Sequence, residues 1–332
     1  MGWAQCWKMP VQAATYRQAE YVMGSVFEIT LDTSETLSEA EQSAFFLPLF
    51  AQLRHQDQVL SHYRPDSELM TVVAALRQPK ASPQKLSTDL CYALKQARFY
   101  HQVTGGSFDI TVGPLVERWG FKSHQFRVPS PEEIADGLRY TGFRQTDFDA
   151  QHCVLSGVAP VNNPLDFGAL GKGIAIDRAV AYFRDHLHAD YPQTQGLAIQ
   201  GGGSSAYFWG APEATPQGWP VISRWGDHQV YWLKNQGLGV SGIDQNFGVY
   251  QGQRYGHILN PLTGEAMRAE QIQGEQVYVV AETAEMADVF STALWVGSPE
   301  QASRWSDRFR FQFWWVAPSP VHYPAGESSS GD

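Results

Sequence analysis

The sequence predicts an α+β fold in which largely antiparallel sheets pack with helices. Strand-like and helix-like segments mix without the regular strand–helix–strand repeat of parallel α/β proteins. The second half of the chain is rich in short apolar strands that glycine or polar turns separate. A hydrophobic content of 43% over 332 residues can supply a substantial core.

The first half begins with a strand and continues into helices. Residues 26–31 alternate in polarity and predict the strand, and residues 38–60 predict a helix with a kink or break at Pro48. Ser87 is placed to cap a helix that runs to about His101 and that the glycine pair 105–106 ends.

Three further helices and four strands follow. The capping box at residues 130–133 opens a short helix to about Leu138, and residues 172–187 and 284–297 also suit helices. The expected strands of the second half are residues 197–200, 230–233, 277–280 and 311–315. From Pro318 the sequence is rich in proline, glycine and serine, which predicts a disordered tail over 318–332.

Composition argues against nucleic acid and membranes as partners. The formal net charge is −10 with only 17% charged residues, whereas nucleic acid and anionic membranes need a basic surface. No run approaches the roughly 20 apolar residues of a membrane span. The first 25 residues lack the apolar core of a signal peptide, so we expect a cytoplasmic protein, or an exported one if its start lies upstream.

The spacing of the three cysteines matches neither a disulfide framework nor a metal-binding motif. Cys6, Cys91 and Cys153 are widely spaced and form no Cys-x-x-Cys pair. Neither a disulfide framework nor a zinc site is expected, and we interpret all three as inert thiols.

The clearest chemical signal is an acid and a hydroxyl one helical turn apart. Asp288 and Thr292 stand in an otherwise apolar run, so in a helix both side chains project from one face. Two oxygen ligands side by side suit Mg²⁺ beside a phosphate. On its own, such a pair is more often a surface or capping feature.

A glycine-rich segment offers a second signal. Residues 166–173 lead into the helix of 172–187, and Lys172 supplies a positive charge for phosphate. The glycine spacing differs from a Walker A loop, and Gly173 stands where Ser or Thr should follow the lysine. The alternative interpretation is a tight turn before a helix.

Four other segments carry weaker chemical signals, and each of them also suits an ordinary turn or structural element. They are residues 61–69, 105–115, 201–205 and 255–264.

Together these segments resemble the ApbE family, the FAD:protein FMN transferases. The resemblance spans about residues 20–297 and rests on eight segments in order: 23–25, 61–69, 106–115, 166–173, 201–203, 241–242, 257–264 and 287–294. It implies an ApbE-like, T-fold-like domain over residues 20–317, preceded by an N-terminal extension over 1–19.

The resemblance also implies a reaction and its site. Bound FAD and Mg²⁺ are expected, with FMN transferred to a Thr or Ser hydroxyl of an acceptor flavoprotein and AMP released. By resemblance, Asp288 and Thr292 are side-chain metal ligands and Ala169 gives a backbone carbonyl. The residues that resemble flavin-nucleotide contacts are Met23, Tyr63, Ser107, Phe108, Asp109, Asp166, Lys172 and His257.

Three of these residues are candidates for catalysis. Phosphoryl transfer depends on positioning and on charge neutralisation, to which Asp288, through Mg²⁺, and Lys172 would contribute. His257 is the candidate base for the acceptor hydroxyl, because a metal-bound carboxylate such as Asp288 is a weak base.

The chain departs from the family pattern at three places. Gly203 or Ser204 stands where an acid or amide is usual, Asn260 replaces an aspartate, and Gly171 replaces the commoner alanine. Two other functions remain open on the sequence. The same site with water as acceptor would be an FAD pyrophosphatase that yields FMN and AMP, and a non-catalytic protein would carry FAD without cleaving it.

Overall fold

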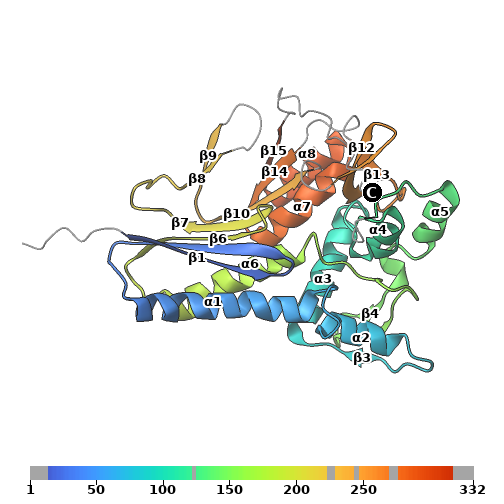
Figure 1. Ribbon diagram of the computed structural model, residues 1–332, viewed down its shortest axis with the longest axis horizontal. Coiled ribbons are helices and arrows are strands. Elements are labelled where there is room, and N and C mark those ends of the chain that lie inside the picture. The colour runs from blue at the N-terminus through green and yellow to red at the C-terminus, as the bar shows by residue number, and fades with distance from the viewer. Residues whose placement is uncertain (1–13, 122–124, 223–228, 243–246, 269–275, 317–332) are drawn as a thin grey trace, which may run out of the picture.

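A computed structural model describes residues 14–121, 125–222, 229–242, 247–268 and 276–316 (Figure 1). Across these residues the central element is a seven-stranded sheet in which every neighbouring pair is antiparallel. Its strands, in spatial order, are β1 (Ala14–Val22), β2 (Ser25–Thr33), β6 (Thr194–Gly201), β7 (Ser205–Gly210), β10 (Gln236–Gly242), β14 (Gln276–Ala281) and β15 (Gln312–Val316). The expected α+β fold with antiparallel sheets is confirmed.

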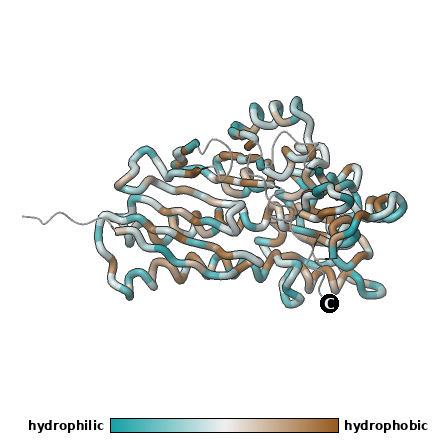
Figure 2. Tube along the Cα trace, turned by 45° about the horizontal axis from the view of Figure 1, so that its top comes forward, coloured by the Kyte–Doolittle hydropathy of each residue, from teal (hydrophilic) through white to brown (hydrophobic). Residues whose placement is uncertain are grey.

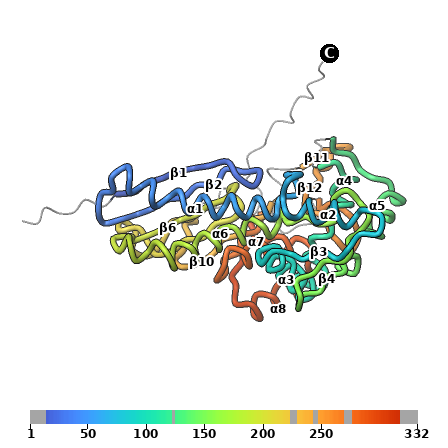
Figure 3. The backbone as a smooth tube through the Cα atoms, turned by 90° about the horizontal axis from the view of Figure 1, so that it is seen from below, coloured from blue at the N-terminus to red at the C-terminus, as the bar shows by residue number. Residues whose placement is uncertain are grey.

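Three helices cover one face of this sheet. They are α1 (Glu39–Leu60), α6 (Gly171–Tyr182) and α7 (Ala284–Val296), and Figure 3 shows α1 and α6 side by side across the strands. Phe27, Ile29 and Leu31 alternate along β2 toward the helices and pack with Phe45 and Leu49 of α1. The opposite face carries the hairpin of β8 (Trp219–Ile222) and β9 (Val230–Leu233).

Most of the remaining elements form the part of the molecule beyond the end of the sheet, on the right in Figure 1, whereas α8 lies beside α7. The helices are α2 (Glu68–Leu76), α3 (Thr88–Val103), α4 (Gly113–Trp119), α5 (Pro131–Arg139) and α8 (Pro299–Phe309), with short 3-10 turns η1 (Ile110–Val112) and η2 (Phe143–Gln145). One small sheet holds β3 (Gln84–Lys85), β5 (Val154–Gly157) and β4 (Asp147–Asp149); another holds β11 (Phe247–Tyr250), β12 (Gln253–Leu259) and β13 (Ala266–Arg268).

The capping signals in the sequence mark the helix starts correctly. Ser87 accepts a hydrogen bond from the Leu90 backbone N–H at the start of α3, and Ser130 with Glu133 forms the expected capping box of α5. Helix α6 ends at Tyr182, and the last turn of the expected helix is the π-helical segment η3 (Phe183–Leu187).

Pro48 does not break α1, which runs as one helix from Glu39 to Leu60. A proline normally costs a helix a hydrogen bond and a steric clash. Here Phe45, Leu49 and Leu53 are fully buried, and this packing holds the helix across the proline. Figure 2 shows apolar and polar segments alternating along the outer helices, as expected of helices with one buried face.

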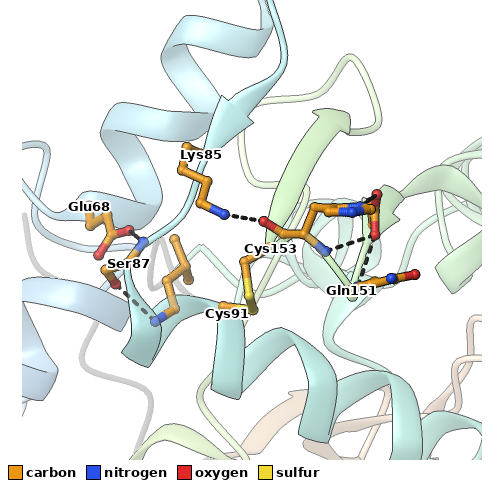
Figure 4. The surroundings of a disulfide bond; sticks show 9 residues. Glu68, Lys85, Ser87, Cys91, Gln151 and Cys153 are labelled. Carbon is orange, nitrogen blue, oxygen red and sulfur yellow. Dashed lines mark hydrogen bonds and ion pairs between the residues drawn. A yellow bond between two sulfur atoms is a disulfide. The ribbon is translucent and has the colours of Figure 1, made fainter.

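The expectation of inert thiols is wrong for two of the three cysteines. Cys91 on α3 and Cys153 in the turn before β5 form a disulfide, with their Cα atoms 5.4 Å apart (Figure 4). The two residues are 62 positions apart, so only the fold brings them together. Cys6 lies outside the described residues.

The two ends of the expected domain, residues 20 and 317, lie near the limits of the described residues. Strand β1 begins at Ala14, so the boundary expected at residue 20 falls inside a strand that pairs along its whole length with β2. The tail expected over residues 318–332 lies outside the described residues. Among the helices that are described, none is long and apolar enough to cross a membrane.

Loss of the disulfide is expected to destabilise the chain. Because the bond closes a loop of 62 residues, the chain-entropy model predicts that Cys91→Ser lowers the free energy of unfolding by about 4 kcal/mol. Denaturant unfolding of the variant, of Cys6→Ser as control and of wild type with and without reductant measures this. Counting free thiols by alkylation checks the pairing, and two reactive thiols at positions 91 and 153 of the oxidised protein would refute it.

Candidate functional site

One large cavity brings the expected site residues together. It has a volume of about 1910 Å³ and is lined by the turn of the β1–β2 hairpin, the loop before α6, strand β12 and helix α7, among others. Every expected site residue lines it: Met23, Tyr63, Ser107, Phe108, Asp109, Asp166, Ala169, Lys172, His257, Asp288 and Thr292. Segments that are more than 250 positions apart in the chain, such as the hairpin turn and α7, therefore meet at one site.

Asp288 is a buried carboxylate with two defined partners. Its Oδ1 accepts a hydrogen bond from the Ser205 hydroxyl at 2.9 Å, and its Oδ2 accepts one from the Gly173 backbone N–H at 3.2 Å. Burial raises the pKa of Asp288, while the positive charge of Lys172 and these two hydrogen bonds act in the opposite direction. A buried anion that faces a cavity is a natural ligand for a cation.

Thr292 lies one turn further along α7 and also lines the cavity. Its Oγ1 is 3.4 Å from the Asp288 backbone carbonyl oxygen and 3.4 Å from the Ser241 hydroxyl. These contacts are long, so the hydroxyl keeps capacity for another partner. Asp288 and Thr292 thus share one helical face, as their spacing predicts.

The first turn of α7 is anchored from two other helices. Both carboxylate oxygens of Asp177 on α6 accept backbone N–H groups of α7, from Ala284 at 2.9 Å and from Glu285 at 2.8 Å. The Glu285 carboxylate in turn accepts hydrogen bonds from the Tyr92 hydroxyl at 2.7 Å and the Gln96 amide at 2.8 Å, both on α3. The helix that carries Asp288 is therefore fixed to α6 and α3.

The loop before α6 presents Asp166 and Ala169 to the cavity, and the first turn of α6 presents Lys172. Asp166 Oδ1 accepts the Gly168 backbone N–H at 2.9 Å, and the Lys172 ammonium donates to the Gly168 carbonyl at 2.9 Å. These bonds tie the loop to the start of the helix, so a positive charge stands at the cavity wall near Asp288.

The segment Ser107–Asp109 forms another wall of the cavity. The glycine pair before it has positive φ angles, 63° for Gly105 and 84° for Gly106, which turn the chain out of α3. The Thr104 hydroxyl then accepts the Phe108 backbone N–H at 3.1 Å. The segment therefore starts from a fixed point at the end of the helix.

Met23, Tyr63 and His257 complete the set from three separate elements. Met23 has a φ of 54° in the two-residue turn between β1 and β2, Tyr63 is 64% exposed, and His257 lies on the exposed face of β12. All three are accessible at the cavity, as residues that meet a ligand must be.

Residues that were not expected from the sequence also line or support the cavity, and two of them contact expected site residues. His62 lines the cavity beside Tyr63, with its Nδ1 3.5 Å from Asp166 Oδ1, and Ser205 binds Asp288. The only local signals were that His62 stands within residues 61–69 and that Ser205 follows the glycines of 201–203.

Comparison with known proteins identifies the family of the chain. The model of the ApbE family matches residues 23–313, which is most of the chain. The chain belongs to the ApbE family. The resemblance seen in the sequence is thereby confirmed.

Individual ApbE proteins resemble the chain over most of their length. The FAD:protein FMN transferase of Escherichia coli K12 is 28% identical over 254 residues, covering 76% of this chain and 70% of that protein. The FAD:protein FMN transferase of Treponema pallidum is 25% identical over 305 residues, covering 85% and 78%. The apo crystal structure of Pseudomonas stutzeri flavinyl transferase ApbE has a TM-score of 0.75 at 24% identity, with 91% and 90% covered, and supports the fold.

The departures from the ApbE pattern are compatible with this site. Asn260 Oδ1 accepts the backbone N–H groups of Leu262 at 2.9 Å and Thr263 at 3.3 Å, so the amide closes the turn as a carboxylate would. Gly203 and Ser204 line the cavity. At Gly171, an added Cβ would lie 3.4 Å from the Met23 methyl carbon, which is an ordinary van der Waals contact, so the position would also accept the commoner alanine.

The anchor of α7 predicts a pH dependence of stability. Burial raises the pKa of Glu285 above its ordinary value of 4.5, so folding keeps a proton that the unfolded chain releases. The free energy of unfolding should therefore fall by up to about 1.4 kcal/mol per pH unit as pH rises from 4.5 through the raised pKa. In Glu285→Gln this decline should be shallower, and part of what remains comes from Asp177, whose pKa burial raises to about 7.

Denaturant unfolding at a series of pH values measures the effect. The matched control is Glu39→Gln, an exposed glutamate in the first turn of α1. Equal pH slopes for wild type and Glu285→Gln would contradict the prediction.

Proposed function

We propose that this chain is a Mg²⁺-dependent FAD:protein FMN transferase, which moves FMN from FAD to a Thr or Ser hydroxyl of an acceptor flavoprotein and releases AMP. Membership of the ApbE family and the names of its relatives support flavin transfer. The observation that carries the proposal is the single cavity that gathers every site residue implied by the resemblance. Its 1910 Å³ suits a ligand of dinucleotide size.

The oxygen groups at α7 fit a magnesium ion whose ligands come partly from the protein and partly from a bound substrate. Within the described residues no group of three His, Cys, Asp or Glu side chains forms a ready metal cage. Mg²⁺ does not require one, because it is usually held by one or two carboxylates together with waters and substrate phosphates. Asp288, Thr292 and the Ala169 carbonyl would be the protein ligands, and the buried Asp288 carboxylate supplies the negative charge.

When bound, Mg²⁺ would stabilise the charge that develops on the diphosphate of FAD. Lys172 adds a positive charge on the same wall of the cavity and neutralises phosphate oxygens. Asp288 must stay ionised to serve as a ligand, and its hydrogen bonds from Ser205 and Gly173 favour the ionised form.

In the transfer step, the acceptor hydroxyl oxygen forms a bond to the phosphorus of the FMN half. The bond from that phosphorus to the bridging oxygen breaks, and AMP leaves with that oxygen. The hydroxyl proton passes to a base, for which His257 is the proposed residue because it lines the cavity on the exposed face of β12. An exposed position gives an acceptor protein access to it.

The metal site is tested by Asp288→Asn. We expect FMN transfer to fall by roughly 10²–10⁴-fold, because loss of the carboxylate removes a metal ligand and its charge, worth several kcal/mol. Mass spectrometry of the acceptor and quantification of AMP are the readouts, and EDTA should cause a similar loss in wild type. Asp307→Asn on the exposed face of α8 is the control.

The same assay separates the candidate functions. FMN on the acceptor in equal amounts with AMP supports transfer, AMP without an adduct indicates a pyrophosphatase, and FAD binding without AMP indicates a carrier. Full transfer by Asp288→Asn at limiting Mg²⁺ would refute the metal assignment.

The proposed base is tested by His257→Asn. We expect kcat to fall by roughly 10²–10⁴-fold, the usual contribution of a positioned acid or base. Mg²⁺ binding should persist, since His257 is not among the proposed ligands. His152→Asn, an exposed histidine paired with Asp149 at 2.7 Å, is the control. An unchanged kcat for His257→Asn would exclude this role.

In place of the cytoplasmic expectation, we propose that the chain works in an oxidising compartment. Disulfides are rare in the reducing cytosol and persist in exported proteins, and Cys91 and Cys153 form one here. The thiol count described above, made on protein taken from its own cell without reductant, checks the proposal.

A further inference from the structure

A second, smaller cavity of about 320 Å³ lies behind one wall of the proposed FAD site. Its lining includes His101 of α3, the glycines 105–106 and Arg144 of η2. Asp109 lines both cavities, so it forms part of the partition between them. Whatever holds Asp109 therefore shapes the wall that faces the larger cavity.

One carboxylate oxygen of Asp109 is held by Thr111. Oδ1 accepts the Thr111 backbone N–H at 2.7 Å and its hydroxyl at 2.6 Å. The Thr111 hydroxyl oxygen in turn accepts the Gly142 backbone N–H at 2.6 Å, so this side of Asp109 is tied to the segment before η2. These partners are neutral and leave the negative charge of Asp109 uncompensated.

The other carboxylate oxygen faces a histidine. Oδ2 of Asp109 lies 3.1 Å from Nδ1 of His101, and the Asp109 side chain is only 2% exposed. A carboxylate this deeply buried is costly unless a positive group pairs with it. His101 is the cationic partner that the structure provides within ion-pair distance of Asp109 among the described residues.

We propose that His101 is a positioning residue for FAD. In its protonated form it holds Asp109, and with it the segment Ser107–Asp109, in the shape that receives the flavin nucleotide. This inference rests on the proposed function, since it takes FAD as the ligand. His101 acts through Asp109 and lines only the smaller cavity, so it is not a catalytic residue.

The electrostatic surroundings of His101 set the direction of the pH effect. Asp109, beside the imidazole, raises the pKa of His101 above its ordinary 6.5, and burial partly opposes this. The charged groups around the ring are Asp109, on the loop before η1, and Arg144, in η2 on the same small cavity. Below the raised pKa the ion pair is intact. As pH rises through it, the charge is lost and Asp109 is left buried without a cation, so FAD binding should weaken.

FAD binding measured against pH tests this inference. Flavin fluorescence titrations with Mg²⁺, from pH 5.5 to 9, are made on wild type and on His101→Gln. The Kd of wild type should rise about tenfold with pH, in the usual range for coupled sites. Glutamine keeps a hydrogen-bond donor but does not titrate, so the Kd of His101→Gln should be nearly independent of pH.

The matched control is His55→Gln, because His55 forms a similar pair with Asp89 at 2.9 Å but its side chain is 54% exposed. It should retain the pH dependence of wild type. At saturating FAD, His101→Gln should keep the kcat of wild type, which separates positioning for binding from a role in the chemical step.

A measurement on wild type alone complements the variants. If protonation favours binding, FAD must raise the pKa of His101 in return, so binding near that pKa takes up protons. Calorimetry in two buffers of different ionisation enthalpy measures this uptake. Absence of uptake, or a wild-type pH dependence in His101→Gln, would overturn the inference while leaving the proposed function intact. Failure of wild type to bind FAD at any pH would overturn both.

Discussion

The close packing of α7 against α6 and β10 is the constraint on which the site depends. A Cβ at Gly173 would lie 2.5 Å from the Cα of Glu285, and one at Gly239 would lie 2.1 Å from the carbonyl oxygen of Ala287. No side chain fits in either place, so the helix rests backbone to backbone on its neighbours. This closeness lets the Gly173 N–H reach the Asp288 carboxylate. A wider separation would leave that buried anion without one of its two donors.

The two ends of the cavity are built by different physical means. The end near Asp288 stands on regular elements, a helix and strands whose positions are set by packing, which suits the precision that the proposed metal ligation would need. The end near Asp109 stands on an irregular segment that Thr104, Thr111 and His101 hold through side-chain contacts. An apolar contact does not respond to pH, whereas a histidine–carboxylate pair does. The proposed flavin end therefore has a pH-sensitive support of its own, in addition to the Glu285 anchor of α7.

Local signals in the sequence predicted the parts of the fold that local physics decides. Ser87 and Ser130 cap helices because a hydroxyl satisfies a backbone N–H two or three residues on, wherever the helix is placed. Of the kink or break expected at Pro48, the break does not occur, since the local cost of the proline is outweighed by the burial of the surrounding helix. The Cys91–Cys153 bond left no trace in the spacing, because it depends on how α3 meets a distant turn.

The residues of the candidate site also fall into those that a local motif indicates and those that only the fold brings together. Residues such as Asp288 and Lys172 stand in short motifs, because the groups that would face a ligand are set by the ligand's own chemistry. The groups that support these residues stand in no such motif. Ser205 is 83 positions from Asp288, and Tyr92 is 193 positions from Glu285. Many side chains can donate one hydrogen bond from behind, so no fixed pattern marks them. Only the folded chain shows which residue donates the hydrogen bond. The contacts that support Asp288 and Glu285, and the His101–Asp109 pair, therefore had to be found in the structure.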